Sequence, residues 1–171
     1  SDSRHPRIRT MSVHIYNNYF DGSAKYGVGV TMGASAFVEA NYFRNVSKPM
    51  MSSGQGSDAL GQGTFSGENG GIIKAYNNKM VNENRVFSYY TQNSPASTGY
   101  DAYEVTERSA QVPSSEVTKA GGTSYNNFDT DTSKFDLGVD TANIDAPEDV
   151  PAKVMAQAGR VNGGDFKWTF N

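Results

Sequence analysis

The sequence predicts an all-β fold, a parallel β-helix, from a repeated turn and an unusual composition. Short apolar segments end in Asn: Asn18 and Asn41 lie 23 residues apart when VHIYNNYF is aligned with FVEANYF, and Asn78 follows 37 residues later. The chain has 18 Gly, 10 Tyr and 9 Phe, but Leu60 and Leu137 are its only leucines, whereas helical proteins rely on Leu, Ala, Glu and Lys. Such a period, with several short strands in each repeat, is typical of stacked β-coils. A β-sandwich with unrelated Asn turns is the alternative.

Each coil is expected to supply one short strand to each of several parallel sheets, so that equivalent residues stack from coil to coil. An Asn at the coil corner can hydrogen-bond backbone groups and the Asn of the next coil, and Asn tolerates left-handed turns. We therefore predict an Asn ladder through the coils. Phe20 and Phe43 occupy equivalent positions in the alignment, which predicts an inward-facing aromatic stack.

Two long loops are expected to interrupt the coils. Residues 52–71 are too rich in Gly for a strand or a helix, and long loops in compact domains are usually functional or mobile. This first loop is interpreted either as the wall of a binding cleft or as a mobile insertion. The periodic pattern also decays over residues 94–124, although Tyr-Asn-Asn recurs at 125–127 and predicts a further turn ending at Asn127.

The coils are expected to occupy residues 1–128, and residues 129–171 are expected to form a tail that packs on the helix body. One short helix is predicted in the tail, because Val150, Val154 and Ala158 are four residues apart and Pro151 suits a first turn. Gly159 can end this helix. Residues 129–133, Asp-Thr-Asp-Thr-Ser, resemble the start of a calcium loop, but Lys134 stands where an EF-hand needs Gly. We interpret them as a solvated acidic turn. The last expectation for the tail is that Trp168 and Phe170 anchor a final strand.

Composition excludes several classes of protein. The 171 residues suit one ordinary domain, and no run of 18 apolar residues could span a membrane. The absence of Cys excludes disulfides and Cys-based zinc sites. A formal net charge of −3 argues against broad nucleic-acid binding.

The opening segment is a basic cluster in an otherwise acidic chain. Arg4, His5, Arg7 and Arg9 fall within six positions, and clustered arginines suit bidentate recognition of carboxylates. An acidic ligand, such as a polymeric sugar acid lying in a groove, fits this pattern. Strict alternation would place Arg4 and Arg9 on opposite faces of a strand, unless the chain bends at Pro6. The alternative is an exposed basic strand that makes surface ion pairs.

The same segment resembles the R-x-P-x-x-R…H-x-x-N-N stretch of polysaccharide lyase family 1, the pectate lyases and related pectin lyases. The Val-Pro-Ala-Lys-Val segment at 150–154 is similar to the C-terminal region of that family. The resemblance implies a right-handed parallel β-helix that cleaves α-1,4-polygalacturonate by β-elimination. The matching positions are Arg4, Pro6, Arg9, His14, Asn17 and Asn18.

By this resemblance Arg4 is the base that removes the C5 proton of a galacturonate, and Arg9 binds the uronate carboxylate. Calcium would bridge enzyme and substrate, so that the metal and a guanidinium stabilise the developing enediolate. A guanidinium has an ordinary pKa above about 12, so Arg4 could act as a base only if nearby cations disfavour its charged form. Such a site would favour an alkaline optimum. His5 and His14 are the rival bases, although the family pattern makes His14 structural.

Further contacts to the polymer are expected from charge alone. Arg7 lies between the two family arginines, and Lys25 and Lys48 fall near the ends of coil segments. We predict Arg7 and Lys25 as substrate-binding residues, with Lys48 as a weaker candidate. Each lysine can equally be an ordinary surface residue.

The family's calcium ligands lie on coils that precede the arginine motif, so the resemblance assigns no metal ligand to this chain. The motif begins three residues after Ser1, and open coil edges are poorly stable by themselves. We therefore expect a C-terminal piece of a longer lyase, which needs an N-terminal segment, either as a second chain or as a cleaved piece, for activity. A polymeric plant substrate implies a secreted, periplasmic or cell-surface protein. The alternatives are a calcium-independent pectin lyase and a non-catalytic polysaccharide-binding module.

Overall fold

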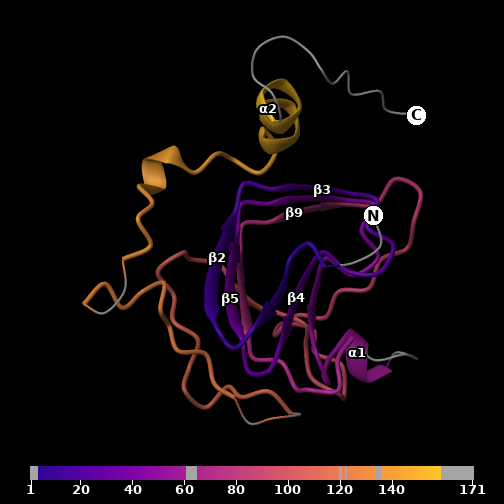
Figure 1. The fold of residues 1–171 in the computed structure, drawn as a ribbon, viewed down its shortest axis with the longest axis vertical. Coiled ribbons are helices and arrows are strands. Elements are labelled where there is room, and N and C mark those ends of the chain that lie inside the picture. Colours follow the sequence, from indigo (N-terminus) through magenta and orange to yellow (C-terminus); the bar gives the residue numbers. More distant parts are fainter. Residues whose placement is uncertain (1–3, 61–64, 120, 122, 134–135, 159–171) are drawn as a thin grey trace.

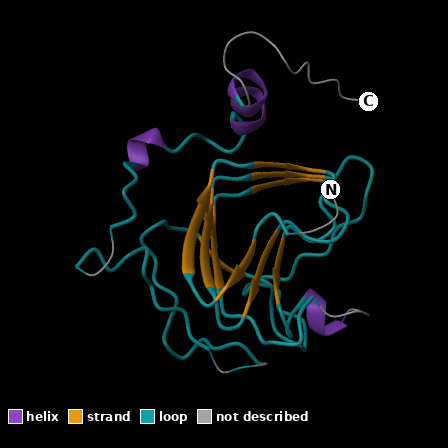
Figure 2. Ribbon diagram, viewed as in Figure 1, coloured by secondary structure: helices purple, strands orange, loops and turns teal. Residues whose placement is uncertain are grey.

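The computed structural model describes residues 4–60, 65–119, 121, 123–133 and 136–158. Its strands form three parallel sheets that make three sides of a β-helix, seen nearly end-on in Figure 1 and as three groups of strands in Figure 2. The predicted fold class is therefore confirmed. No helix in the described part of the chain is long and apolar enough to cross a membrane.

Consecutive strands of one coil enter the three sheets in turn. Sheet 1 contains β1 (Arg7–Arg9), β4 (Val28–Thr31) and β7 (Met50–Ser52). Sheet 2 contains, in spatial order, β10 (Tyr103–Val105), β8 (Ile73–Tyr76), β5 (Ser35–Glu39) and β2 (Ser12–Tyr16). Sheet 3 contains β3 (Tyr19–Asp21), β6 (Tyr42–Arg44) and β9 (Lys79–Val81). All paired strands are parallel, so β1, β2 and β3 lie together at one end of the stack.

The interior of the coils is filled by the inward-facing apolar residues of all three sheets. Ile8, Ile15 and Val38 point into one buried apolar cluster, as the alternation of side chains along a strand requires. The rings of Phe20 and Phe43 stack within it, with centroids 4.4 Å apart and planes 8° from parallel. The predicted aromatic stack is confirmed.

The Asn ladder runs along the corner between sheets 2 and 3. The Oδ1 atom of Asn41 accepts hydrogen bonds from the backbone N–H of Asn18 at 2.9 Å and from its Nδ2 at 3.0 Å. Asn78 accepts in the same way from Asn41, at 3.1 and 3.0 Å. The residue before each ladder position has a left-handed backbone, with φ near 50° at Asn17 and Asn77. This repeated turn explains why the Asn spacing revealed the coils.

The two predicted loops contain more regular structure than their sequences indicate. A short helix, α1 (Ser57–Leu60), lies in the first loop, which was expected to hold none. Strand β10 lies in the second loop and pairs with β8 as a fourth coil. Both elements are only three or four residues long, which is too short for a periodic signal. Asn127 is not a ladder residue, because its side chain pairs with the backbone N–H and carbonyl of Val112.

The described parts of residues 106–129, the covering segment, pass along the outer side of sheet 2 (Figure 1). They bury the outward-facing residues of β5 and β8, with Phe37 and Lys74 0% exposed, whereas Tyr16 of β2 remains 36% exposed. Val112, Tyr125 and Phe128 pack there against Phe37 of β5. Asp129 is 8% exposed and pairs with Lys74, so the prediction of a solvated acidic turn was wrong for this residue. Its buried counter-charge lies 55 positions away in the sequence, beyond the reach of any local pattern.

The tail continues through a 3₁₀ turn, η1 (Thr141–Asn143), to α2 (Val150–Gln157) beside sheet 3 (Figure 2). Pro151 lies in the first turn of α2, as predicted. Asn17 fastens the tail to the first coil, since its side chain exchanges two hydrogen bonds with the backbone of Asp145 at 2.8 and 3.0 Å. Lys134, Gly159, Trp168 and Phe170 lie outside the described residues.

Candidate active site

The first strand carries two arginines on its solvent side. Ile8 is 4% exposed and points into the core, so alternation turns Arg7 and Arg9 to the outer face of sheet 1. Arg9 is exposed and Arg7 is half-buried. Lateral pairing with β4 places Arg7 opposite Gly29 and Arg9 opposite Thr31.

Arg4 lies before the strand, beyond a bend at Pro6. The strand begins only at Arg7, the His5–Pro6 peptide bond is cis, and Arg4 has a φ of 74°. The His5 N–H donates to the carbonyl of Gly27 at 3.1 Å, which ties the bend to the next coil. The predicted bend is therefore present, and Arg4 is solvent-exposed.

The motif arginines have no carboxylate partner among the residues that the structure describes. Arg44, by contrast, contacts Asp21 at 3.0 Å and Glu83 at 2.6 Å. The ion pairs expected if this were only a basic surface strand are thus not formed within residues 4–60, 65–119, 121, 123–133 and 136–158. Arg4 and Arg9 are exposed, so their guanidinium donors remain available to an external acid, and half-buried Arg7 can offer only donors other than its buried Nε. Planar donors of this kind match carboxylates.

The candidate lysines lie on connections that border the arginines. Lys25 is exposed and belongs to the connection between β3 and β4, two residues before Gly27. Lys48 is half-buried between β6 and β7, where its charge offsets a small part of the rise that burial causes in the pKa of Asp101. Lys25 is thus two residues from Gly27, whose carbonyl accepts from the His5 N–H in the bend after Arg4, and Lys48 lies two coils from that bend.

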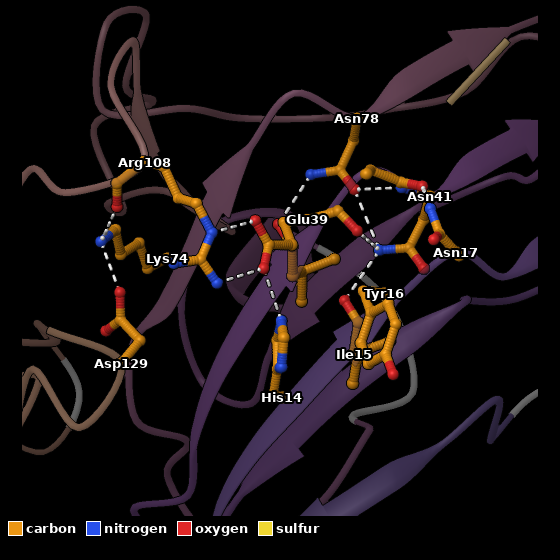
Figure 3. Close-up of polar contacts among 12 residues, drawn as sticks. His14, Ile15, Tyr16, Asn17, Glu39, Asn41, Lys74, Asn78, Arg108 and Asp129 are labelled. Atoms are coloured by element: carbon orange, nitrogen blue, oxygen red, sulfur yellow. Dashed lines mark hydrogen bonds and ion pairs between the residues drawn. The ribbon is translucent and has the colours of Figure 1, made fainter. Parts of the chain in front are cut away.

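The two histidines occupy different surroundings. His5 is half-buried in the bend, and its Nε2 has no hydrogen-bond partner within the described residues. His14 lies on the outer face of sheet 2, where its Nε2 is 2.7 Å from Glu39 (Figure 3). Its ring also stacks on that of Phe37, with centroids 5.1 Å apart. His14 therefore faces the covering segment, and not the arginine face, which is the outer face of sheet 1 that carries Arg7 and Arg9.

A buried charge cluster surrounds that histidine and was not found from the sequence. Arg108 donates two hydrogen bonds to Glu39, from Nε to Oε2 at 2.9 Å and from Nη2 to Oε1 at 2.8 Å (Figure 3). Burial disfavours the charged form of Glu39, but the hydrogen bonds from His14 and Arg108 outweigh it and hold the pKa of Glu39 below its ordinary value. These partners are 25 and 69 positions apart, so only folding brings them together.

The same face holds a second buried ion pair. The Nζ atom of Lys74 is 2.6 Å from Asp129 and donates to the carbonyl of Arg108 at 3.0 Å (Figure 3). Tyr125 donates its hydroxyl to the other oxygen of Asp129 at 2.8 Å, and the pKa of this hydroxyl is raised chiefly by burial. Both clusters fasten residues 106–129 to sheet 2, and neither reaches the arginine face.

A cavity of about 540 Å³ opens at the free end of the first coil. Its lining includes His5 and Pro6 from the bend, inward-facing Ile15 and Phe20, and outward-facing Tyr16. Residues from both faces of β2 line the cavity. The cavity therefore lies over the unpaired edges of the first-coil strands and not over one face of a sheet. It lies beside the bend that follows Arg4.

Metal ligands were not expected in this chain. Within the described residues, no three His, Cys, Asp or Glu side chains converge on a point that could hold a metal ion. The acidic residues near the arginines are also engaged elsewhere, as in the contact of Asp21 with Arg44. The described residues therefore do not fit the calcium site that the resemblance implies.

Comparison with known proteins assigns the family. A sequence profile described as "Pectate lyase" matches residues 2–126 of the chain, a region that includes the arginine bend and all ten strands. This chain belongs to the pectate lyase family. Two pectate trisaccharide-lyases of Bacillus licheniformis are 41% identical to this pectate lyase family member over 51 residues, which is 30% of its length and 15% of theirs. The aligned region thus spans about one seventh of those relatives.

Proposed function

We propose that this chain is the arginine-bearing C-terminal part of a pectate lyase that cleaves α-1,4-polygalacturonate by β-elimination. The observation that carries the proposal is the set of arginines at the first coil, whose donors meet no carboxylate in the described part of the chain. A polyuronide supplies regularly spaced carboxylates that would complete such a site. Membership of the pectate lyase family supports the same substrate class.

The proposed chemistry divides between two positions of the motif. Arg9, on the outer face of sheet 1, binds the uronate carboxylate and stabilises the charge that develops on it as an enediolate. Arg4, in its neutral form, takes the proton from C5. The electron pair of the C5–H bond forms the C4–C5 double bond, the C4–O4 bond breaks, and the departing oxygen takes up a proton. Exposed Lys25 lies two residues before Gly27, which is hydrogen-bonded to the bend, and would contact a further carboxylate.

We further propose that residues preceding this chain complete the enzyme. Strands β1, β2 and β3 each end their sheet, and the 540 Å³ cavity lies along that end. A preceding coil could pair with these edges and fill the cavity. Calcium ligands, when present, would have to come from such coils, and calcium would then neutralise a substrate carboxylate. Secretion is part of this proposal because the substrate is an extracellular polymer.

The test follows unsaturated oligogalacturonides by their ultraviolet absorbance, using the complete protein and demethylated polygalacturonate. We expect a chelator to abolish the product, Arg4→Ala and Arg4→Lys to lose it, and Arg85→Ala to retain it. Arg85 is a matched control because it is exposed and lies outside the motif. Activity that survives Arg4→Ala would overturn Arg4 as the base.

Two other functions predict different results in this assay. A pectin lyase would prefer methylated pectin and resist the chelator, but methylation removes the charge that unpaired arginines recognise. A non-catalytic module would bind polygalacturonate without forming the unsaturated product. Comparing demethylated with methylated substrate, alongside a binding measurement, separates all three functions.

A further inference from the structure

Residues 65–70 cover the outer face of sheet 1 immediately beyond the arginine strand. Thr31 donates to the carbonyl of Glu68 at 2.8 Å, and Ser53 donates to the carbonyl of Ser66 at 3.0 Å. Outward-facing Thr31 of β4 is consequently 0% exposed, and outward-facing Met51 of β7 is 4% exposed. Because Arg9 remains exposed, the accessible part of this face ends at β1.

Phe65 lies at the boundary between the covered and open parts of the face. Its ring centroid is 5.2 Å from the guanidinium carbon of Arg7 and 4.6 Å from the ring of Tyr26, which it meets edge-on. The backbone N–H of Phe65 donates at 2.8 Å to Asp58, a buried carboxylate that also accepts from the Gly54 N–H. The hydrogen bond orders the Phe65 backbone, and the edge-on contact with Tyr26 orders its ring.

Gly29 creates the space that this ring occupies. A Cβ atom at position 29 would lie 2.7 Å from the Phe65 ring and 2.7 Å from the Tyr26 ring, closer than Cβ atoms approach other heavy atoms in proteins. Gly29 is also the residue opposite Arg7 in the β1–β4 pairing. A residue with a side chain here would displace Phe65 away from Arg7.

The contact with Phe65 holds Arg7 without using its hydrogen-bond donors. The Nε atom of Arg7 is buried and has no hydrogen-bond partner within the described residues, and no described carboxylate pairs with this guanidinium. A ring at 5.2 Å attracts the cation through its face and restricts the long side chain before any ligand arrives. Pre-ordering of this kind lowers the entropy lost on binding.

We propose that Phe65 is a positioning residue that holds Arg7 for a carboxylate of a bound polyuronide. The inference rests on the proposed function, since it needs an acidic chain at the arginine face. Phe65 acts through Arg7 and has no part in the bond-breaking steps. This proposal assigns residues 65–70 of the Gly-rich loop to the wall of the site.

The first test measures the contact without substrate. Phenylglyoxal modifies accessible arginines, and peptide mass spectrometry gives the rate at Arg7 relative to Arg9. Phe65→Ala and Gly29→Ala should each raise the relative rate at Arg7 by about 2- to 5-fold, the range that corresponds to an exposed cation–π contact. Phe65→Tyr should keep the original rate. Gly67→Ala is the matched control, because a Cβ there would meet nothing within 4 Å.

The second test measures trigalacturonate binding to the complete protein by calorimetry. The dissociation constant should rise about 2- to 5-fold in Phe65→Ala and Phe65→Leu, and Phe65→Tyr should restore it. An unchanged rate at Arg7 in Phe65→Ala, or full affinity in Phe65→Leu, would overturn the role of Phe65 alone. Absence of binding by the unsubstituted protein would instead overturn the proposed function, and the role of Phe65 with it.

Discussion

Replacing Lys74 by methionine should destabilise the protein strongly, because it leaves a buried carboxylate without its counter-charge. Lys74 is 0% exposed, and its Nζ lies 2.6 Å from Asp129. After the substitution the Tyr125 hydroxyl, at 2.8 Å, would be the only described side-chain group still bonded to that carboxylate. The substitution also removes the cation that lies 4.8 Å from the ring of Phe37.

The expected cost follows from the burial of both partners. Removing one member of a buried ion pair typically costs about 3–5 kcal/mol, whereas replacing both members by apolar residues is often close to neutral. A loss of about 4 kcal/mol multiplies the unfolded fraction about a thousandfold, within a total stability of about 5–15 kcal/mol for a natural domain. The double variant Lys74→Met/Asp129→Leu should therefore recover most of the stability lost in the single variant.

Urea unfolding followed by circular dichroism measures these differences, and hydrogen exchange at the Val112 amide reports whether the covering segment detaches. That amide donates to Asn127 within the segment. Lys79→Met is the control, since the Nζ of Lys79 lies 3.8 Å from Glu148 and its side chain is 47% exposed. A loss below about 1 kcal/mol in Lys74→Met, the range of an exposed pair, would refute the reasoning. So would a double variant no more stable than the single one.

Three further predictions concern the ladder and two carboxylates. Asn41→Ala should lower the unfolding temperature more than Asn18→Ala, because buried Asn41 bonds the backbone of two strands and the next ladder residue, whereas Asn18 is exposed; equal losses would contradict this. Burial raises the pKa of Asp101 to about 7, so the folded state keeps a proton that the unfolded state loses and stability falls between about pH 4 and 7, by about 4 kcal/mol at most. Asp101→Asn should remove this dependence and raise the urea midpoint at pH 8. Glu39 contributes stability above its ordinary pKa that is lost as pH falls through its lowered folded value, so Arg108→Gln should shift acid unfolding to higher pH; an unchanged acid midpoint would refute that role.

The features predicted correctly from sequence are those that repeat along the chain. Asn41 occupies the same corner as Asn18 one coil later, and Phe43 occupies the same interior position as Phe20. Both pairs arise because each coil must make the same turn and fill the same interior position. Repetition converts a local preference into a long-range contact, since residues one period apart are neighbours in the stack. The arginine motif was visible for a different reason, as a dense cluster of one charge.

The features that sequence reasoning missed are contacts between unlike segments. No period links Glu39 to Arg108, and Asp129 looked like part of a hydrophilic turn because its partner is a lysine in a distant strand. Lys74 itself stands in an apolar strand, between Ile73 and Ala75, where an outward-facing lysine is normally exposed to solvent. The covering segment lacks the repeat of the coils, so its sequence does not indicate which sheet face it covers.

The sequence by itself determined the coil, its corner ladder, its aromatic stack and the basic strand of its first coil. Each of these follows either from the regular spacing of Asn and Phe residues or from a local cluster of arginines. Only the tertiary structure decided which faces of the coil stay open. The covering segment buries the outer face of sheet 2 at β5 and β8, and residues 65–70 lie over the outer face of sheet 1 beyond Arg7. Which faces are covered depends on the packing of Phe65 over Gly29 and on the ion pair between Asp129 and Lys74. These residues are far apart in the sequence and meet only once the chain has folded.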